Sequence, residues 1–170
     1  VDEGDKGLNT GGMGAISPVP FAGEAFMQKV ISTIINPTIS GLKKEQIEYV
    51  GFIFFGIIKV GDDPYVIEYK CRMGDPETEA VLSRLKNDLV ALFEATATQR
   101  LHEIKLETDS RKTVTIMAVS GGYPGEYEKG LSIDGLDLLQ EDDAIVSHAG
   151  TKQEDDTTAT NGRRALPVHS

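Results

Sequence analysis

The chain has 170 residues, of which 39% are hydrophobic and 26% are charged, a balance typical of a globular protein rather than a disordered one. Its formal net charge of -10 repels phosphate backbones and anionic lipid, so neither nucleic acid nor a membrane is expected as a partner. The single cysteine, Cys71, excludes a disulfide within the chain, and no apolar stretch is long enough to cross a bilayer as a helix.

The first part of the chain predicts a loop, a helix and a β-hairpin. Residues 1–20 are rich in glycine and proline, which favours a loop. Residues 21–47 place apolar side chains at helical spacing, and Pro37 should kink or divide this helix. Residues 49–60 are apolar on both faces and predict a buried strand; after a turn, residues 65–70 predict the returning strand.

A second helix is predicted over residues 76–97, which carry a leucine-rich stripe. Asp75 is expected to be its N-cap, with Pro76 in the first helical position. Residues 98–112 are polar and charged, so we place a domain boundary there.

The boundary divides the chain into residues 1–100 and 101–170. In the second part, residues 113–119 are rich in β-branched side chains and predict a strand. Shorter strands are expected at 144–148 and 164–168. We therefore expect an α+β fold in which the second domain is small and mostly β.

A glycine-rich segment near the start of the chain is the first candidate site. Glycines let the backbone approach a ligand closely and point N–H groups at an anion, and polar neighbours add hydrogen bonds. Composition alone favours the alternative of a flexible surface loop. The segment is not a Walker loop, because no Gly-Lys-Ser/Thr follows. Its candidate residues are Asn9, Thr10, Gly11, Gly12, Met13 and Gly14.

Glu68 is the second candidate, because it faces away from its two apolar neighbours on the predicted strand. A carboxylate in this place could hold Mg²⁺, which prefers oxygen ligands. Lys70 points to the same face, so an ion pair between Glu68 and Lys70 is the alternative. From the residues alone, the ion pair is slightly favoured.

The third candidate is the segment from Arg72 to Glu77. Arg72 offers a planar fork suited to a phosphate or carboxylate, and Asp75 could accept an ammonium group. The alternative is that Asp75, Pro76 and Glu77 simply begin the helix, with the acids favoured by its dipole. The two interpretations are compatible, because a helix N-terminus itself attracts anions.

Four segments, in order and at the family's spacing, resemble the C-terminal portion of glycinamide ribonucleotide synthetase (phosphoribosylamine–glycine ligase). They are Asn9–Pro18, Val66–Tyr69 with Cys71–Thr78, Gly121–Gly125 with Tyr127–Gly130, and His148–Lys152 followed by Thr160–Gly162. The resemblance implies a cytoplasmic enzyme of the ATP-grasp superfamily. Residues 1–100 would then form the C-terminal half of the ATP-grasp fold, an antiparallel sheet with helices, and the rest a small, mostly β domain.

The resemblance also implies an activity and roles for the candidate residues. The family uses ATP and Mg²⁺ (or Mn²⁺) to join glycine to 5-phosphoribosylamine through a glycyl phosphate, a step of purine biosynthesis. By that analogy Glu68 is a metal ligand, and Arg72 and Asp75 are catalytic. Substrate binding would involve residues 9–14 together with Arg72, Gly74, Asp75, Pro76 and Glu77.

Three positions depart from the family pattern. Leu8 replaces the usual Pro, which loosens the glycine-rich segment. Lys70 stands where the family has a second metal ligand, Asn, and an ammonium has no lone pair for Mg²⁺. Arg163 stands where the family has Gly, and it would strain the turn if positive φ is needed there. The alternatives are therefore a non-catalytic, degenerate ATP-grasp module, or an ATP-grasp ligase for another ribonucleotide. We read both ends as truncations, so the N-terminal portion of the same enzyme is an expected partner.

Overall fold

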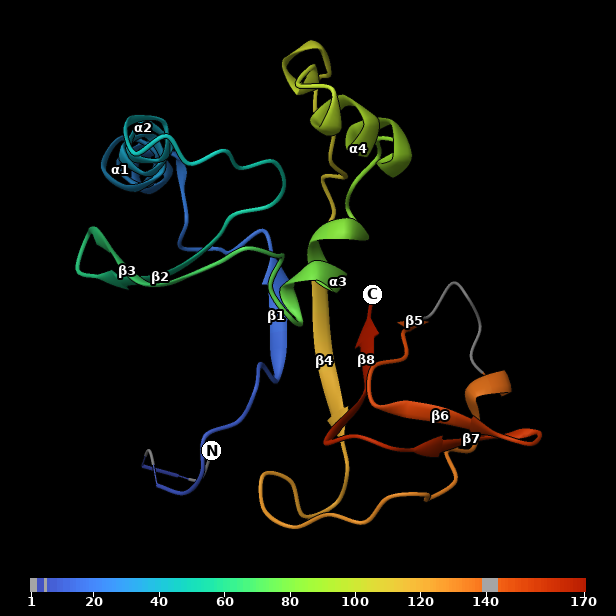
Figure 1. Ribbon diagram of the computed structural model, residues 1–170. Coiled ribbons are helices and arrows are strands. Elements are labelled where there is room, and N and C mark those ends of the chain that lie inside the picture. Colours follow the sequence, from blue (N-terminus) through green and yellow to red (C-terminus); the bar gives the residue numbers. More distant parts are fainter. Residues whose placement is uncertain (1–2, 5, 139–143) are drawn as a thin grey trace. The chain divides into compact units, whose positions relative to one another are not determined.

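The computed structural model describes residues 3–4, 6–138 and 144–170. Helices and antiparallel strands are mixed in the chain, so the expected α+β fold class is confirmed (Figure 1). None of the helices within these ranges is long and apolar enough to span a membrane.

The chain forms two compact units that alternate along the sequence. The expected division at residue 100 concerns domains along the sequence, and it stays a prediction. The two compact units instead interleave along the chain. The first unit contains residues 1–17, 75–84 and 111–170, and the second contains residues 18–74 and 85–110.

The first unit is built on a four-stranded antiparallel sheet in the order β1–β4–β8–β5. Along β4, residues alternate between buried and exposed, and the short helix α3 packs against β1, β4 and β8. The strands expected at 113–119, 144–148 and 164–168 are confirmed, whereas β1 lies in the segment expected to be a loop. The bounds are β1 Gly14–Ser17, α3 Glu77–Leu82, β4 Thr113–Val119, η3 Leu136–Leu138, β5 Ile145–Val146 and β8 Arg164–His169.

Besides this sheet, the first unit contains a hairpin that joins β6 (Thr151–Glu154) to β7 (Thr157–Thr160). We did not expect it from the sequence, because β6 reads Thr-Lys-Gln-Glu and has no apolar face. Asp155 lies in the turn with a φ of 49°, a conformation that Asp tolerates better than most residues. Residues 113–170 therefore contain β6 and β7, which the hydrophobic pattern did not mark, in addition to the predicted strands.

The second unit begins with a helical run divided into α1 (Glu24–Val30), the π-helical η1 (Ile31–Ile35) and α2 (Asn36–Lys44). Pro37 lies in the first turn of α2. Proline has no backbone N–H to donate to the preceding turn. The wider π-helical turn of η1, just before Pro37, accommodates this missing hydrogen bond. The predicted division at Pro37 is thus confirmed.

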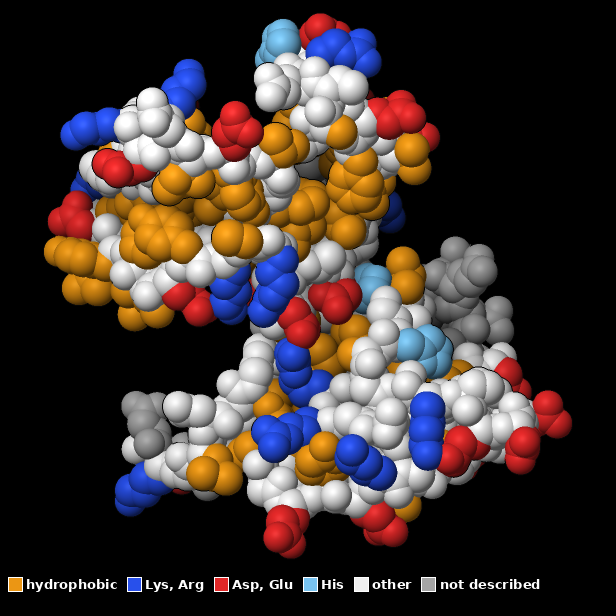
Figure 2. Space-filling view, viewed as in Figure 1, with side chains coloured by type: hydrophobic (Ala, Val, Ile, Leu, Met, Phe, Trp, Pro, Cys, Tyr) orange, Lys and Arg blue, Asp and Glu red, His pale blue; other side chains and the backbone are white. Residues whose placement is uncertain are grey.

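The hairpin of the second unit pairs β2 (Phe54–Val60) with β3 (Asp63–Lys70) and has a bulge after Gly56. The hairpin was predicted, but the expectation that residues 49–60 are buried on both faces was wrong. Ile58 and Val60 are exposed, because a two-stranded sheet is covered on one side by α1 and open on the other. Figure 2 shows the hydrophobic side chains that gather over β2, β3 and α1.

The prediction of a single helix over residues 76–97 was also wrong. The structure has two helices instead, α3 and α4 (Leu89–Ala97), followed by the 3-10 turn η2 (Leu101–Glu103). Asp88 explains the break, because its carboxylate accepts hydrogen bonds from two backbone N–H groups of α4, at 2.8 and 3.0 Å. An N-cap of this kind starts a new helix within an apolar pattern that continues past it.

Candidate functional site

The candidate residues divide between the two units. Glu68, Arg72 and Gly74 belong to the second unit, and residues 9–14 and 75–77 belong to the first. Each group is described by itself.

The glycine loop, residues 9–14, is fastened to the first unit. The Gly11 N–H donates to the Tyr123 hydroxyl at 2.7 Å. A Cβ on Gly12 would lie 2.4 Å from Pro76 Cδ and 2.6 Å from the carbonyl oxygen of Asp75. Glycine is therefore required at position 12 by close packing of two backbone segments. The segment lies at the surface but is held at Gly11 and Gly12.

The remaining loop residues lead into β1. Asn9 is exposed and Thr10 is half-buried. The Met13 carbonyl accepts a hydrogen bond from Met117 of β4 at 3.0 Å. Gly14 begins β1, where a Cβ would lie 2.8 Å from the carbonyl oxygen of Thr115. The sheet thus holds one end of the loop, and the polar side chains at the other end remain accessible.

Asp75 is bound by Arg164, the first residue of β8. The guanidinium donates to both carboxylate oxygens, at 3.0 and 2.5 Å, and also to the carbonyl oxygen of Gly12 at 3.0 Å. The Arg164 side chain is 22% exposed and the Asp75 side chain 47%. We call this arrangement of Arg164, Asp75 and Gly12 the arginine clamp.

The N-cap role expected for Asp75 was wrong. Pro76 occupies the N-cap position of α3, which has no side-chain cap, and Asp75 turns to Arg164 instead. Pro76 is fully buried, and Glu77 is the first helical residue and half-buried. The backbone of this segment packs against Gly12, so the glycine loop and the Asp75–Glu77 segment lie side by side.

Arg164 was missed by sequence reasoning. The residue follows another arginine, and nothing in the sequence distinguishes it from Arg163. Its partner Asp75 is 89 residues away along the chain, so no local pattern could reveal the contact.

In the second unit, Glu68 forms an ion pair with Lys70. The Lys70 Nζ lies 2.9 Å from Glu68 Oε1 and 5.2 Å from the centre of the Phe54 ring, a cation–π contact. Their side chains are 32% (Lys70) and 49% (Glu68) exposed. The alternative that sequence reasoning slightly favoured, an ion pair on one face of the strand, is what the structure shows.

The side chains around Glu68 do not fit a divalent cation as they stand. An ammonium within hydrogen-bond distance of the carboxylate repels a second cation and offers no lone pair. Among residues 3–4, 6–138 and 144–170, no group of three or more His, Cys, Asp or Glu is placed to hold a metal ion. The metal role of Glu68 therefore stays a prediction that depends on moving Lys70.

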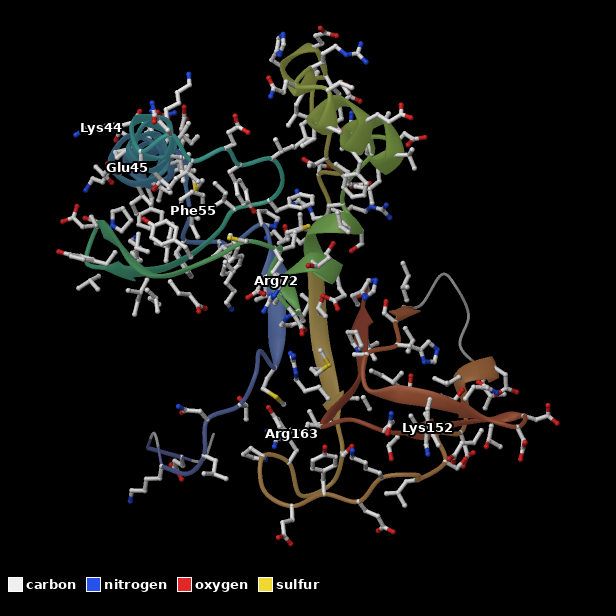
Figure 3. All side chains as sticks on the ribbon, in the orientation of Figure 1. Lys44, Glu45, Phe55, Arg72, Lys152 and Arg163 are labelled. Atoms are coloured by element: carbon white, nitrogen blue, oxygen red, sulfur yellow. The ribbon has the colours of Figure 1, made fainter. Side chains whose placement is uncertain are left out.

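Arg72 lies two residues after the end of β3 and is exposed (Figure 3). Its Nη1 donates to the carbonyl oxygen of the neighbouring Met73 at 2.7 Å. Gly74, two residues on, is buried. A guanidinium has five N–H donors, so this one bond leaves most of its capacity for an anionic ligand.

A cavity of about 200 Å³ lies in the second unit between α2 and the hairpin. Burial raises the pKa of the Tyr49 hydroxyl, and the nearby Cys71 raises it further. The hydroxyl also donates to the carbonyl oxygen of Phe52. The cavity is lined by Thr38, Leu42, Tyr49, Ile53, Tyr69, Lys70 and Cys71.

The strain expected at Arg163 is not found. Among the described residues, the non-glycine positions with positive φ are Gln46, Gln99 and Asp155. A tight approach to this turn comes from Gly150 of another segment, where a Cβ would lie 2.4 Å from the carbonyl oxygen of Arg164. An arginine at position 163 is therefore compatible with the turn.

Comparison with known families identifies the chain. Residues 1–78 match the family model described as phosphoribosylglycinamide synthetase, ATP-grasp (A) domain, and residues 113–170 match the C domain of the same family. The chain belongs to the phosphoribosylglycinamide synthetase family. The resemblance noted from the sequence is thereby confirmed, together with the ATP-grasp assignment of its first part.

Members of the phosphoribosylglycinamide synthetase family align with nearly the whole chain. The phosphoribosylamine–glycine ligase of Halalkalibacterium halodurans is 44% identical over 166 residues, which are 98% of this chain and 38% of the relative. That of Fusobacterium nucleatum is 40% identical over 172 residues, covering 100% and 40%. The crystal structure of the Thermotoga maritima ligase superposes with a TM-score of 0.76 at 32% identity, covering 98% and 40%. The chain thus spans about two fifths of the length of these relatives.

Proposed function

We propose that this chain is part of a cytoplasmic, ATP-dependent ligase that joins glycine to 5-phosphoribosylamine in purine biosynthesis. The observation that carries the proposal is the match of two domains of one ligase family, in order, along a single chain. Relatives named phosphoribosylamine–glycine ligase at 40–44% identity support it. The partners in this proposal are the small-molecule substrates and the N-terminal portion of the same enzyme.

The residues of this chain would act mainly by binding and orienting substrates. Bound ATP supplies the phosphoryl group that activates the glycine carboxylate as a glycyl phosphate, which the amine then attacks. The exposed fork of Arg72 suits a carboxylate or phosphate, and the half-exposed carboxylate of Asp75 suits an amine. Holding two reactants in register is itself a large part of catalysis in such transfers.

A divalent cation would be held through Glu68 and would supply neutralisation of phosphate charge. Lys70 occupies that carboxylate, so Glu68 is not available to the ion in this arrangement. The same ion pair is the observation that favours the second candidate function, a degenerate ATP-grasp module without catalysis. The names of the relatives favour the ligase over this alternative.

The test is a chimaera in which residues 1–170 replace the aligned stretch of the Halalkalibacterium halodurans ligase. We expect ADP formation that requires both glycine and phosphoribosylamine and that is lost in Arg72→Ala and Glu68→Ala. A folded chimaera without turnover, in which Lys70→Asn restores turnover, would identify Lys70 as the cause and support the degenerate module. A folded chimaera that stays inactive with Lys70→Asn would overturn the ligase proposal.

A further inference from the structure

The arginine clamp joins three parts of the first unit that are far apart in sequence. Arg164 comes from β8, Asp75 precedes α3, and Gly12 lies in the glycine loop. One planar guanidinium binds both oxygens of Asp75 and, through Nη1, also the Gly12 carbonyl. This two-point geometry fixes the plane of the carboxylate as well as its position, which a lysine cannot do.

Packing around the guanidinium leaves it little freedom. A Cβ on Gly11 would lie 3.0 Å from both Cζ and Nε of Arg164, so the side chain crosses directly over the glycine loop. Arg164 itself is paired with Val119 in the β4–β8 ladder, so its backbone belongs to the rigid sheet. The clamp therefore restrains the glycine loop and Asp75 at a fixed position relative to the sheet.

Asp75 keeps an open side despite its ion pair. Its side chain is 47% exposed while that of Arg164 is 22% exposed, so the guanidinium is covered and the carboxylate faces solvent. Each carboxylate oxygen has two lone pairs, and the clamp uses one on each oxygen. The others can accept from an amine or ammonium that approaches from the solvent side.

We propose that Arg164 is a positioning residue, which orients the Asp75 carboxylate and the glycine loop for an amine-bearing substrate. This inference rests on the proposed function for the identity of the substrate, whereas its structural part stands on the clamp alone. If the ion pair served only the stability of the first unit, its loss would speed exchange equally in the loop and in the β4–β8 ladder. It would also leave the kinetics of a folded chimaera unaltered.

The first arm uses the chain itself and residue-level amide hydrogen exchange measured by NMR. In Arg164→Lys and Arg164→Gln, the amides of residues 11–14 should exchange roughly tenfold faster or more, because local opening becomes easier. The amides of the β4–β8 ladder should keep their rates. Arg163→Gln is the matched control, since this exposed neighbour takes no part in the clamp, and it should change neither set.

The second arm uses the chimaera described above. Arg164→Gln should lower kcat/KM for phosphoribosylamine roughly 10- to 100-fold through misplacement of the carboxylate. Arg164→Lys should recover only part of the loss, and added guanidinium ion should restore activity to Arg164→Ala. KM for ATP should stay at the value of the parent chimaera.

In the exchange arm, three results would overturn the positioning role. They are unchanged exchange in the glycine loop, equal acceleration of the loop and the β4–β8 ladder, and loss of the fold in Arg164→Lys. Unaltered kinetics in an active chimaera would do the same. If the parent chimaera forms no ADP, the proposed function fails, and the exchange arm alone still decides whether the clamp holds the loop.

Discussion

Replacing Lys70 with methionine should open Glu68 to divalent cations. Because Nζ lies 2.9 Å from Glu68 Oε1 and Mg²⁺–oxygen bonds are about 2.1 Å long, an ion on this oxygen would lie at most about 5 Å from Nζ. At that distance a monovalent and a divalent cation repel each other by about 1.7 kcal/mol in a water-like medium. Removal of the ammonium should therefore tighten metal binding about 20-fold.

The fold should tolerate the change. Both side chains are partly exposed, and an ion pair of this kind contributes about 0.2–1 kcal/mol. Mn²⁺ is a suitable probe, because its binding is measured directly by electron paramagnetic resonance. Lys70→Arg keeps the charge and is the matched control, whereas Lys70→Asn adds an oxygen ligand and should bind most tightly. Equal Mn²⁺ affinity in Lys70→Met and the native chain, or no binding in either, would refute this reasoning.

Three further perturbations test the structure in other places. Gly12→Ala should lower the free energy of unfolding by about 1–3 kcal/mol, since the new methyl group meets the Asp75–Pro76 backbone. Asp88→Ala should lower it by about 1 kcal/mol through loss of the α4 N-cap. Tyr49 should ionise at a higher pH than an unperturbed tyrosine, and Cys71→Ala should bring its pKa down, because the thiolate charge is removed. As pH rises above about 10, the unfolded chain releases this proton first, so the contribution of Tyr49 is neutral below that pH and destabilising above it.

Each of these predictions has its own control. Gly121→Ala introduces a methyl group into open space and should be close to neutral in urea unfolding. Asp88→Asn keeps an N-cap acceptor, so a loss equal to that of Asp88→Ala would speak against the cap. Tyrosinate absorbance identifies the Tyr49 titration by its disappearance in Tyr49→Phe, and a normal pKa there would contradict the burial of the hydroxyl.

The parts of the fold that could be predicted are those in which the pattern is local. The hairpin of β2 and β3 and the strand β4 follow from β-branched and aromatic runs with a turn between them or after them. The division of the first helix follows from Pro37 alone. Each of these features depends on residues within a few positions of one another, which is the range that a single sequence displays.

The errors arose where a local pattern was overruled. The apolar stripe over 76–97 continues across the break, but the capping of α4 by Asp88 separates two helices. The polar strand β6 has no apolar face, and its pairing with β7 could be recognised only through the turn at Asp155. Hydrogen bonds determine where α4 begins and that β6 forms a strand. Hydrophobic periodicity instead predicted one continuous helix and no strand at β6.

The candidate site was found in part. The glycine loop and Asp75 were named from their residue types, and the structure fastens them side by side. The arginine that connects them comes from a strand at the far end of the chain, and no spacing rule could select it. The conflict between Lys70 and a metal site at Glu68 could be predicted from the sequence. An ammonium on the same face of a strand as a carboxylate is expected to form an ion pair with it, whatever the surrounding fold.

The alternation of the two units affects the order in which a growing polypeptide can acquire structure. Strand β1 leaves the ribosome before its partner β4, which follows about a hundred residues later, with Gly14 opposite Ile116. The hairpin of β2 and β3 pairs across a short turn and can close as soon as it emerges. The second unit can therefore form during translation before β4 and β8 are available to order the glycine loop.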